Sequence, residues 1–99
     1  MHIEKLSLYV ITLNEEKRLP RMLESVKSLV DEIVIVDSGS TDKTEEIARS
    51  YGAKFLFHEW QSSGHQVKIA EDNCSHEWVM RLDADEVIPP RLAEEISGI

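Results

Sequence analysis

The stretch with the clearest capacity for chemistry is DADE at residues 83–86, which places three carboxylates within four positions. Like charges this close repel one another unless they point apart into water or share a cation. The oxygens of Asp83 and Asp85, separated by one residue, suit a Mg²⁺ or Mn²⁺ ion held jointly by protein and phosphates. The same motif is also typical of a simple turn that caps a helix, and the motif alone does not favour either interpretation.

Two further clusters contain residue types that bind ligands. TLNEE spans residues 12–16, and DSGSTD spans residues 37–42. In the second cluster Gly39 permits a tight turn, and the helix that follows would offer free backbone amides. Asp37 can accept hydrogen bonds from N–H or hydroxyl groups of a ligand. Taken alone, DSGSTD is also ordinary turn and helix-capping chemistry.

The periodicity of the chain predicts the elements that position these clusters. Runs of apolar and β-branched residues predict strands, and apolar residues at helical spacing predict helices between them. The predicted strands are residues 6–13, 32–37, 53–59 and 77–82, and the predicted helices are residues 19–30, 42–52, 65–74 and 90–99. This alternation indicates an α/β fold with a mostly parallel sheet of about four strands flanked by helices. Ligands of such sheets bind at the carboxyl ends of the strands, so the three clusters would meet at one edge.

Local signals refine some of these elements. Asp42 and Glu45 resemble a capping box at the start of the second helix, and Gly52 is a predicted C-cap. In the last strand, alternation predicts one face that carries Trp78, Met80 and Leu82 and another that carries Val79 and Arg81. Arg81 could pair with Asp83 or reach a phosphate, and the sequence leaves both open.

Composition limits the classes of function. Residues 1–99 suffice for a single domain, and a formal net charge of −8 disfavours a nucleic-acid partner. No apolar run exceeds four residues, as at Ile33–Val36, so neither a membrane span nor a secretory signal is expected. The single cysteine, Cys74, fits a reducing compartment, and we expect a cytoplasmic protein.

Other candidate sites are weaker. The spacing of His58, His65, Cys74 and His76 fits no structural zinc pattern, and no G-x-G-x-x-G motif for a dinucleotide is present. The two tryptophans, Trp60 and Trp78, are expected to pack against neighbouring side chains rather than to stack on a ligand.

The three clusters, in this order and spacing, resemble those of family 2 glycosyltransferases, which have the GT-A fold. The most specific signal is VDSGSTDKT at residues 36–44 followed by LDADE at residues 82–86. The resemblance extends from Ser7 to Leu92 and is strongest to the branch that builds lipopolysaccharide cores and other bacterial surface glycans. It implies the N-terminal, nucleotide-sugar-binding half of the fold, which is Rossmann-like and has the sheet order 3-2-1-4.

The resemblance also implies a function. Such enzymes bind a nucleotide-sugar, usually a UDP-sugar, and transfer the sugar with inversion to a glycan or lipid-linked acceptor. Carried over by motif, Asp37 would contact the base, Asp83 the ribose and diphosphate, and both Asp83 and Asp85 a divalent cation, Mg²⁺ or Mn²⁺. The other residues assigned to the nucleotide-sugar site are Thr12, Asn14, Glu15 and Lys68.

The sequence departs from the family pattern in three respects. Leu13 stands where many members have a tyrosine that stacks on the base, and Val67 occupies the usual basic position, with Lys68 one residue later. The region that carries the general base in the family follows the metal motif and has no counterpart here. We therefore expect the isolated chain to bind the donor but to transfer little or no sugar.

Two alternative functions come from other classes. A phosphotransferase of the haloacid-dehalogenase type also has Asp-x-Asp after a strand, but it expects threonine where Val87 stands and has the motif near its N-terminus. A non-catalytic fragment that self-associates is the other alternative. In the order 3-2-1-4 the strand at residues 77–82 would be an exposed edge, which predicts a homodimer or higher oligomer through that edge or its helix face.

Overall fold

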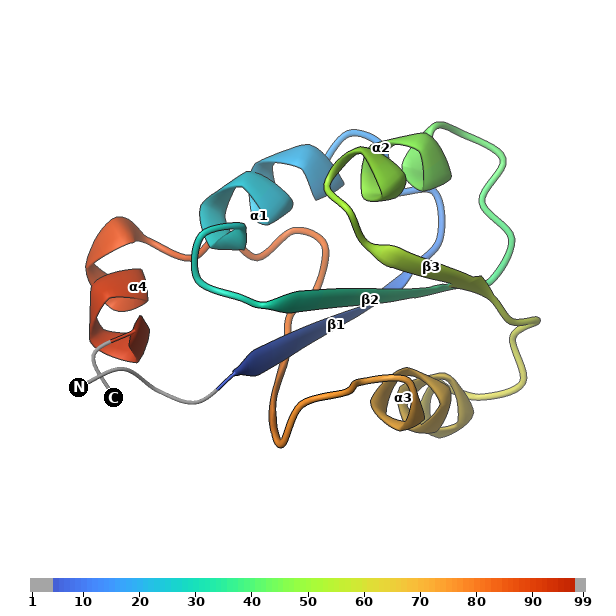
Figure 1. The fold of residues 1–99 in the computed structure, drawn as a ribbon. Helices are drawn as coiled ribbons and strands as arrows, with labels where there is room; N and C mark the ends of the chain where they lie inside the picture. The colour runs from blue at the N-terminus through green and yellow to red at the C-terminus, as the bar shows by residue number, and fades with distance from the viewer. Residues whose placement is uncertain (1–4, 98–99) are drawn as a thin grey trace.

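The computed structural model describes residues 5–97, in which four strands alternate with four helices (Figure 1). The elements, in chain order, are β1 (Leu6–Thr12), α1 (Leu19–Val26), β2 (Glu32–Asp37), α2 (Thr44–Ser50), β3 (Lys54–Phe57), α3 (Ser63–Asp72), β4 (Trp78–Arg81) and α4 (Pro90–Ser97). The predicted alternation is confirmed, although most elements are shorter than predicted. The end of the helix predicted over residues 90–99 lies outside the described residues.

All four strands lie parallel in one sheet with the order β3-β2-β1-β4, which confirms the predicted fold class and sheet order. The central strands β1 and β2 pair from Ser7–Glu32 to Thr12–Asp37. Helices α1 and α2 cover one face of the sheet, and α3 lies on the other (Figure 1). No helix among residues 5–97 has both the length and the apolar composition needed to cross a membrane.

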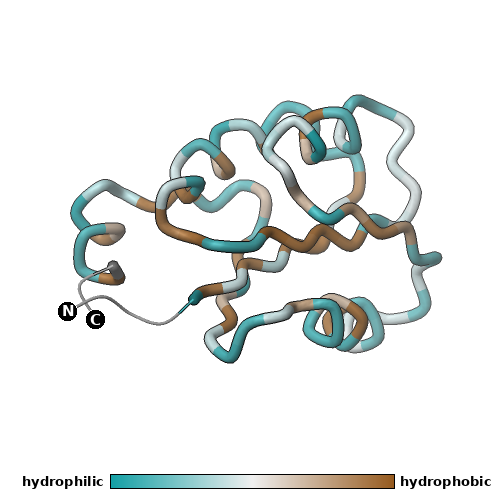
Figure 2. The backbone as a smooth tube through the Cα atoms, viewed as in Figure 1, coloured by the Kyte–Doolittle hydropathy of each residue, from teal (hydrophilic) through white to brown (hydrophobic). Residues whose placement is uncertain are grey.

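Each face of the sheet has its own apolar core (Figure 2). Because successive residues of a strand point to opposite faces, Leu8 and Val10 pack beneath α1, whereas Tyr9 packs toward α3. Helix α1 buries a stripe of residues at helical spacing: Leu19, Met22, Leu23 and Val26. Burial of each such large apolar side chain contributes about 1.5–3 kcal/mol. This double coverage explains why β1 and β2 are apolar on both faces.

Helix α1 ends at Val26, four residues before the predicted end, because the chain must turn back into the sheet. The N–H groups of Leu29 and Val30 both donate to the carbonyl of Val26. The N–H of Asp31 then donates to the carbonyl of Leu6, at 2.8 Å. The apolar residues after Val26 therefore belong to a turn, which helical periodicity alone could not distinguish from another helical turn.

The start of α2 differs from the predicted capping box. The Asp42 carboxylate accepts hydrogen bonds from the N–H and the hydroxyl of Thr44 instead of the N–H of Glu45. The bond from the Thr44 hydroxyl lowers the pKa of Asp42. At the other end, Gly52 follows the helix with φ of +75°, as expected for a C-cap glycine.

The last elements also differ in detail from the prediction. Helix α3 begins at Ser63, two residues earlier than expected, because the Ser62 side chain accepts a hydrogen bond from the N–H of His65 and caps it. In β4, Met80 packs against the core beneath α1 and Leu82 is buried in it, as predicted for this face. Trp78 shares their parity but is half-exposed, because it lies at the start of an edge strand.

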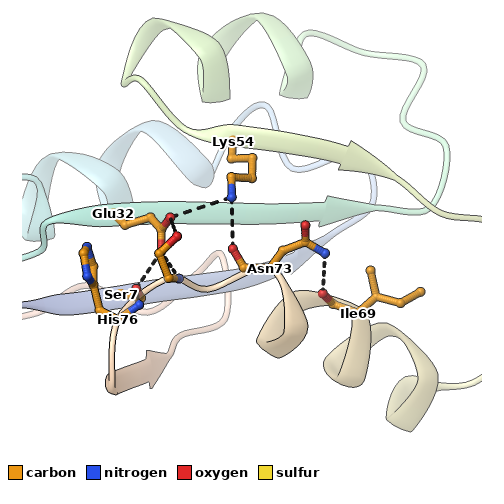
Figure 3. A network of polar contacts seen from close by, with 7 residues as sticks. Ser7, Glu32, Lys54, Ile69, Asn73 and His76 are labelled. Carbon is orange, nitrogen blue, oxygen red and sulfur yellow. Dashed lines mark hydrogen bonds and ion pairs between the residues drawn. The ribbon is translucent and has the colours of Figure 1, made fainter.

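A polar cluster at the amino ends of the strands is centred on Glu32 (Figure 3). Its carboxylate accepts hydrogen bonds from the Ser7 hydroxyl (2.7 Å) and from the N–H (2.7 Å) and hydroxyl (2.8 Å) of Ser75. The Nζ atom of Lys54 lies 3.8 Å from the same carboxylate and also donates to the carbonyl of Asn73. Glu32 therefore joins β1, β3 and the loop between α3 and β4.

These contacts set the protonation of Glu32. Partial burial acts to raise its pKa, but the hydrogen bonds from Ser75 and Ser7 and the charge of Lys54 outweigh that effect and lower the pKa to about 2. The carboxylate therefore stays ionised in mildly acidic water. The cluster lies at the end of the sheet opposite the three sequence clusters, so its role is structural.

Candidate functional site

The three polar clusters follow the carboxyl ends of β1, β2 and β4, and the parallel sheet brings those ends to one edge. The loops after β1 and β2 lie side by side, because these strands pair up to Thr12 and Asp37. The loop after β4 is next to β1 on the other side, through the pairing of Tyr9 with Arg81. The predicted convergence of the clusters at one sheet edge is therefore confirmed.

The centre of the first two loops is the pair Thr12 and Asp37, each only 2% exposed. The Thr12 hydroxyl donates to Oδ1 of Asp37 at 2.6 Å, and the Ser40 hydroxyl donates to the same oxygen. The other oxygen, Oδ2, accepts from the N–H groups of Gly39 (2.8 Å) and Ser40 (2.6 Å). Four hydrogen bonds match the ordinary capacity of a carboxylate. A ligand N–H that approached Asp37 would therefore have to share or displace one of these bonds.

Backbone geometry allows this arrangement. Gly39 has φ of +122°, a conformation that L side chains rarely adopt, and it lets the chain fold back over the Asp37 carboxylate. Asn14, at φ of +54°, turns the neighbouring loop so that its N–H donates to the Ser40 hydroxyl (2.7 Å) and its side-chain oxygen accepts from the N–H of Thr41 (2.8 Å). Asn14 tolerates this left-handed conformation better than most residues.

Two glutamates extend the connection between these loops. The N–H of Glu15 donates to the Thr44 hydroxyl (2.8 Å), and its carboxylate forms an ion pair with Arg18 (2.7 Å). Glu16 donates its N–H to Asp42 and accepts from the N–H of Lys43. The structure thus brings together four of the predicted site residues, Thr12, Asn14, Glu15 and Asp37.

A cleft of about 570 Å³ opens beside these loops. It is lined by Asn14, Glu15, Glu16, Lys17, Arg18 and Asp42. Lys17 and Arg18 were not predicted from the sequence, although two basic residues directly after TLNEE indicate them. A larger cavity of about 840 Å³ between α1 and α4 contains none of the predicted site residues.

The three acidic residues of the DADE loop are all exposed to solvent. Ala84 is buried at 2% exposure, so the chain is anchored between Asp83 and Asp85, which are both exposed. The Glu86 carboxylate accepts the N–H of Asp83 (2.7 Å), and the Glu86 N–H donates to the Asp83 carbonyl (3.0 Å). The third carboxylate therefore closes a turn.

Asp83 and Asp85 fit a metal held only in part by the protein. Within residues 5–97, no three His, Cys, Asp or Glu side chains converge in a way that could hold a metal ion. Exposed carboxylates are nevertheless the hard oxygen donors that Mg²⁺ and Mn²⁺ prefer, and such ions commonly complete their coordination with phosphates and water. Arg81 Nη2 lies 4.0 Å from Oδ1 of Asp83, so the pair suggested by the sequence is present but loose.

Lys68 is a predicted site residue that lies outside the three polar loops, on α3. Its side chain is 77% exposed on α3, where its Nζ donates to Asp72 at 3.3 Å. No contact joins it to the loops after β1 and β2 in the described part of the chain. The adjacent basic position in the family pattern, Val67, packs against the core beneath α3.

Gln66 connects α3 to the site, and the sequence reasoning did not identify it. This side chain is fully buried; its Nε2 donates to the carbonyl of His58 (3.1 Å) and its Oε1 lies 3.0 Å from Nδ1 of the same residue. The N–H of His58 in turn donates to the carbonyl of Asp37 (2.8 Å). The signal for Gln66 in the sequence is that a polar residue stands on the side of α3 that faces the core.

Apolar side chains are exposed around the same edge. Leu13 is 53% exposed, Phe57 67% and Trp60 53%. The Cε1 atom of Phe57 lies over Gly39, 3.5 Å from where a Cβ would be. Trp60 and Trp78 are both about half-exposed, so each is partly covered by the rest of the chain.

Relatives of this chain are glycosyltransferases. It is 41% identical over 97 residues to the glycosyltransferase RT0209 of Rickettsia typhi, covering 98% of this chain and 33% of that protein. It is 39% identical over 94 residues to the lipopolysaccharide core biosynthesis glycosyltransferase LpsC of Rhizobium meliloti, covering 90% and 34%. The chain therefore spans about a third of the length of the curated relatives it matches.

Solved structures have the same fold. Residues 1–349 of TarS from Staphylococcus aureus match with a TM-score of 0.76 at 25% identity, over 96% of this chain and 32% of that one. The glucosyl-3-phosphoglycerate synthase of Mycobacterium tuberculosis, in complex with Mn²⁺, UDP and glucosyl-3-phosphoglycerate, matches with a TM-score of 0.71 at 27% identity, over 81% and 33%.

The family assignment rests on most of the chain. The model of glycosyl transferase family 2 matches residues 7–97, which include all three polar clusters. The relatives and the solved structures agree with that match, and they do not favour the haloacid-dehalogenase alternative. The resemblance to the lipopolysaccharide-core branch is likewise confirmed. This chain belongs to glycosyl transferase family 2 and has the Rossmann-like parallel sheet of the GT-A fold.

Proposed function

We propose that this chain is the part of a glycosyltransferase that binds a nucleotide-sugar donor, most simply a UDP-sugar. The observation that carries the proposal is the position of three polar loops at the carboxyl edge of the sheet, two of them joined through Thr12 and Asp37. In α/β sheets this edge is where ligands bind. The complex of the mycobacterial synthase with Mn²⁺ and UDP supports the choice of ligand.

The loops after β1 and β2 would form the nucleotide side of the site. Asp37 and Thr12 hold the loops in place, and Asn14 and Glu15 extend over the same edge. Asp37 would reach a base by exchanging one of its four internal hydrogen bonds for one from the ligand. Lys68 would contribute only if its side chain left Asp72.

The loop after β4 would supply the cation ligands. Asp83 and Asp85 would hold Mg²⁺ or Mn²⁺ together with the donor diphosphate, with Asp83 also near the ribose. The bound cation would neutralise negative charge that develops on the leaving diphosphate. A chain with a net charge of −8 has particular need of such a cation, because its own field repels an anionic ligand.

We propose sugar transfer with inversion to a glycan or lipid-linked acceptor in bacterial surface glycan synthesis, located in the cytoplasm. The similarity to LpsC supports the pathway, and the single half-buried cysteine, Cys74, fits a reducing compartment. Because the chain spans a third of its relatives and no described carboxylate has been assigned as general base, we expect the 99-residue chain alone to be inactive. Sugar transfer by the purified chain would contradict that expectation.

The test is a calorimetric titration of the 99-residue chain with UDP, with and without Mn²⁺. We expect binding that requires Mn²⁺ and that the double variant Asp83→Ala/Asp85→Ala abolishes. The matched control, Glu46→Ala/Glu95→Ala, removes two exposed carboxylates from α2 and α4 and should bind like the parent chain. Equal binding by the first double variant and the parent would refute the assignment of Asp83 and Asp85. Absence of UDP binding by the folded parent would refute a working donor site.

We also propose that the chain forms a homodimer through the open edge of β4. The support is that β4 is an edge strand whose exposed side chains include Trp78 and Val79. This contact is separate from donor binding and can fail or succeed independently of it.

A further inference from the structure

Ser40 lies between the two loops that form the nucleotide side of the proposed site. Its hydroxyl donates a hydrogen bond to Oδ1 of Asp37 and accepts one from the N–H of Asn14, at 2.7 Å. A single oxygen atom is therefore the donor to a carboxylate and the acceptor for a backbone N–H. Asp37 is only 2% exposed, whereas Ser40 is half-buried and Asn14 is exposed. Ser40 thus connects a buried carboxylate to a loop that solvent reaches.

Of the four groups that donate to Asp37, the Ser40 hydroxyl is the one that can leave most easily. The N–H groups of Gly39 and Ser40 belong to the backbone, so they move only if the loop moves. Thr12 is fixed in β1 at 2% exposure, where a rotated hydroxyl would stay buried without water. Rotation of Ser40 about χ1 between staggered rotamers moves no backbone, and its half-buried hydroxyl can then bond to water.

The two loops stay joined when the Ser40 side chain rotates. The Thr12 hydroxyl still donates to Asp37 at 2.6 Å, and the N–H of Thr41 still donates to the side-chain oxygen of Asn14 at 2.8 Å. Rotation therefore leaves Oδ1 of Asp37 and the N–H of Asn14 in place. These two groups are an acceptor and a donor close enough together to have shared one oxygen atom.

We propose that in the free chain the Ser40 hydroxyl occupies the place of the hydrogen-bonding edge of the donor's base, and that the base displaces it; this inference rests on the donor site proposed above. The base must then present an N–H to Asp37 beside a C=O that accepts from Asn14. Uracil and thymine have this edge, because their ring N–H lies between two carbonyl groups. Ser40 is accordingly a residue that sets both the affinity for the base and its identity.

Other bases fit this arrangement poorly. Cytosine, placed in the same way, has a lone pair on the corresponding ring nitrogen and directs it at the Asp37 carboxylate. To offer its exocyclic N–H instead, it would have to shift along its edge, although the ribose and diphosphate hold the base in position. A site that is built to bond one polar group strongly rejects an analogue that lacks it.

Leu13 increases the importance of this polar edge. It is 53% exposed beside Asn14, and its aliphatic side chain offers a base apolar contact without an aromatic ring. Stacking on a ring would tolerate every base, since each has a π face. Discrimination between bases therefore depends on the hydrogen bonds at Asp37 and Asn14.

The first test compares Ser40→Ala with the parent chain by urea unfolding and by calorimetric titration with UDP in the presence of Mn²⁺. Loss of the two Ser40 bonds should lower the free energy of unfolding, whereas removal of the internal competitor should raise the affinity for UDP by about three- to tenfold. A residue with a merely structural role would lower both quantities. The control Ser50→Ala removes a hydroxyl that bonds to Ile47 within α2, and it should bind UDP like the parent.

The second test varies the base. CDP has the same ribose and diphosphate as UDP, and we expect the parent to bind it at least about tenfold more weakly. The diphosphate of 3-methyluridine, which lacks only the ring N–H, should bind as weakly as CDP. Ser40→Ala should raise the affinity for UDP and leave the affinity for the other two ligands unchanged.

NMR spectroscopy detects the rotation itself. Three-bond couplings of Ser40 report its χ1 angle, and the amide resonance of Asn14 reports the acceptor of its N–H. We expect both to change when UDP saturates the parent chain, and neither to change with CDP at the same concentration. A χ1 angle of Ser40 that is the same in the free chain and in the UDP complex would overturn the proposal.

The outcomes distinguish this inference from the function on which it rests. A folded parent chain that binds no UDP overturns the donor site and the role of Ser40 together. If the parent binds UDP but Ser40→Ala binds it equally or more weakly, the displacement of Ser40 is refuted and the donor site stands. Equal affinities of the parent for UDP and CDP would likewise refute the selection of the base alone.

Discussion

Replacement of Glu32 by glutamine is the change that most directly tests how the amino end of the sheet is held. The substitution keeps the shape of the side chain but removes its charge, and it replaces one acceptor oxygen by a donor amide. Ser7, Ser75 and Lys54 all direct donors at this carboxylate, so the new amide must face at least one of them. At least one of these donors then loses its acceptor, and all of them lose the charge that strengthens their interaction with Glu32.

The expected loss of unfolding free energy follows from the pKa of Glu32. Glu32 has an ordinary pKa of 4.5, and its surroundings lower it to about 2 in the folded chain. At 1.36 kcal/mol for each pKa unit, that difference corresponds to at most about 3 kcal/mol of folding free energy. The side chain is 16% exposed, so solvent screens part of the interaction and we expect a loss of about 1–3 kcal/mol.

The contribution of Glu32 to the unfolding free energy changes with pH in one direction. Because the folded pKa of Glu32 is depressed, its contribution is fully present above pH 4.5, the ordinary value, and is lost as pH falls toward 2. Urea unfolding followed by circular dichroism should give a lower free energy of unfolding for Glu32→Gln at pH 7, and a difference from the parent that shrinks below about pH 4. The control Glu46→Gln, on the surface of α2, should match the parent. A difference that is absent at pH 7 would show that the Glu32 contacts do not stabilise the fold. A difference that stays constant from pH 7 to pH 3 would show that the charge of Glu32 does not contribute.

Two further changes test the loops at the carboxyl edge. Thr12→Val keeps the side-chain volume but removes the hydrogen bond to Asp37, so we expect about 1–3 kcal/mol lower unfolding free energy in urea and weaker UDP binding by calorimetry. An unchanged unfolding midpoint would argue against that bond. Gly39→Ala places a Cβ at φ of +122° and 3.5 Å from Phe57, so we expect a larger loss of stability than for Gly52→Ala, whose φ is +75° with open space around it. Thermal unfolding of the two variants decides this, and the reverse order of melting temperatures would contradict it.

The sequence predicts the fold well where one physical signal dominates. The apolar runs at β1 and β2 are long because both faces of the sheet are covered, and no turn residue interrupts them. Periodicity failed at the end of α1, where Leu29 and Val30 continue the apolar pattern but the chain must turn to reach β2. The sheet order was predicted from the resemblance to family 2 glycosyltransferases, because the sequence of a strand does not specify the strand with which it pairs.

The candidate site was only partly predictable for a similar reason. Polar clusters after strands located the loops correctly, since parallel strands bring their carboxyl ends to one edge. Gln66 was missed because its role depends on burial and on its hydrogen bonds to His58, which the local sequence pattern does not indicate. Lys68 was assigned from its neighbourhood in the sequence, and the helix turns it toward Asp72 instead.

The carboxylates of this chain show why residue type alone does not identify a metal ligand. Asp37 and Glu32 each accept three or more hydrogen bonds from their own chain, so their oxygens are already occupied by structural contacts. Glu86 is occupied by the N–H of Asp83. Asp83 and Asp85 keep oxygens that face water, beside a buried Ala84 that fixes their position. A cation in this acidic chain would therefore compete with water at these two residues, whereas at the others it would have to break the hydrogen bonds that hold the fold together.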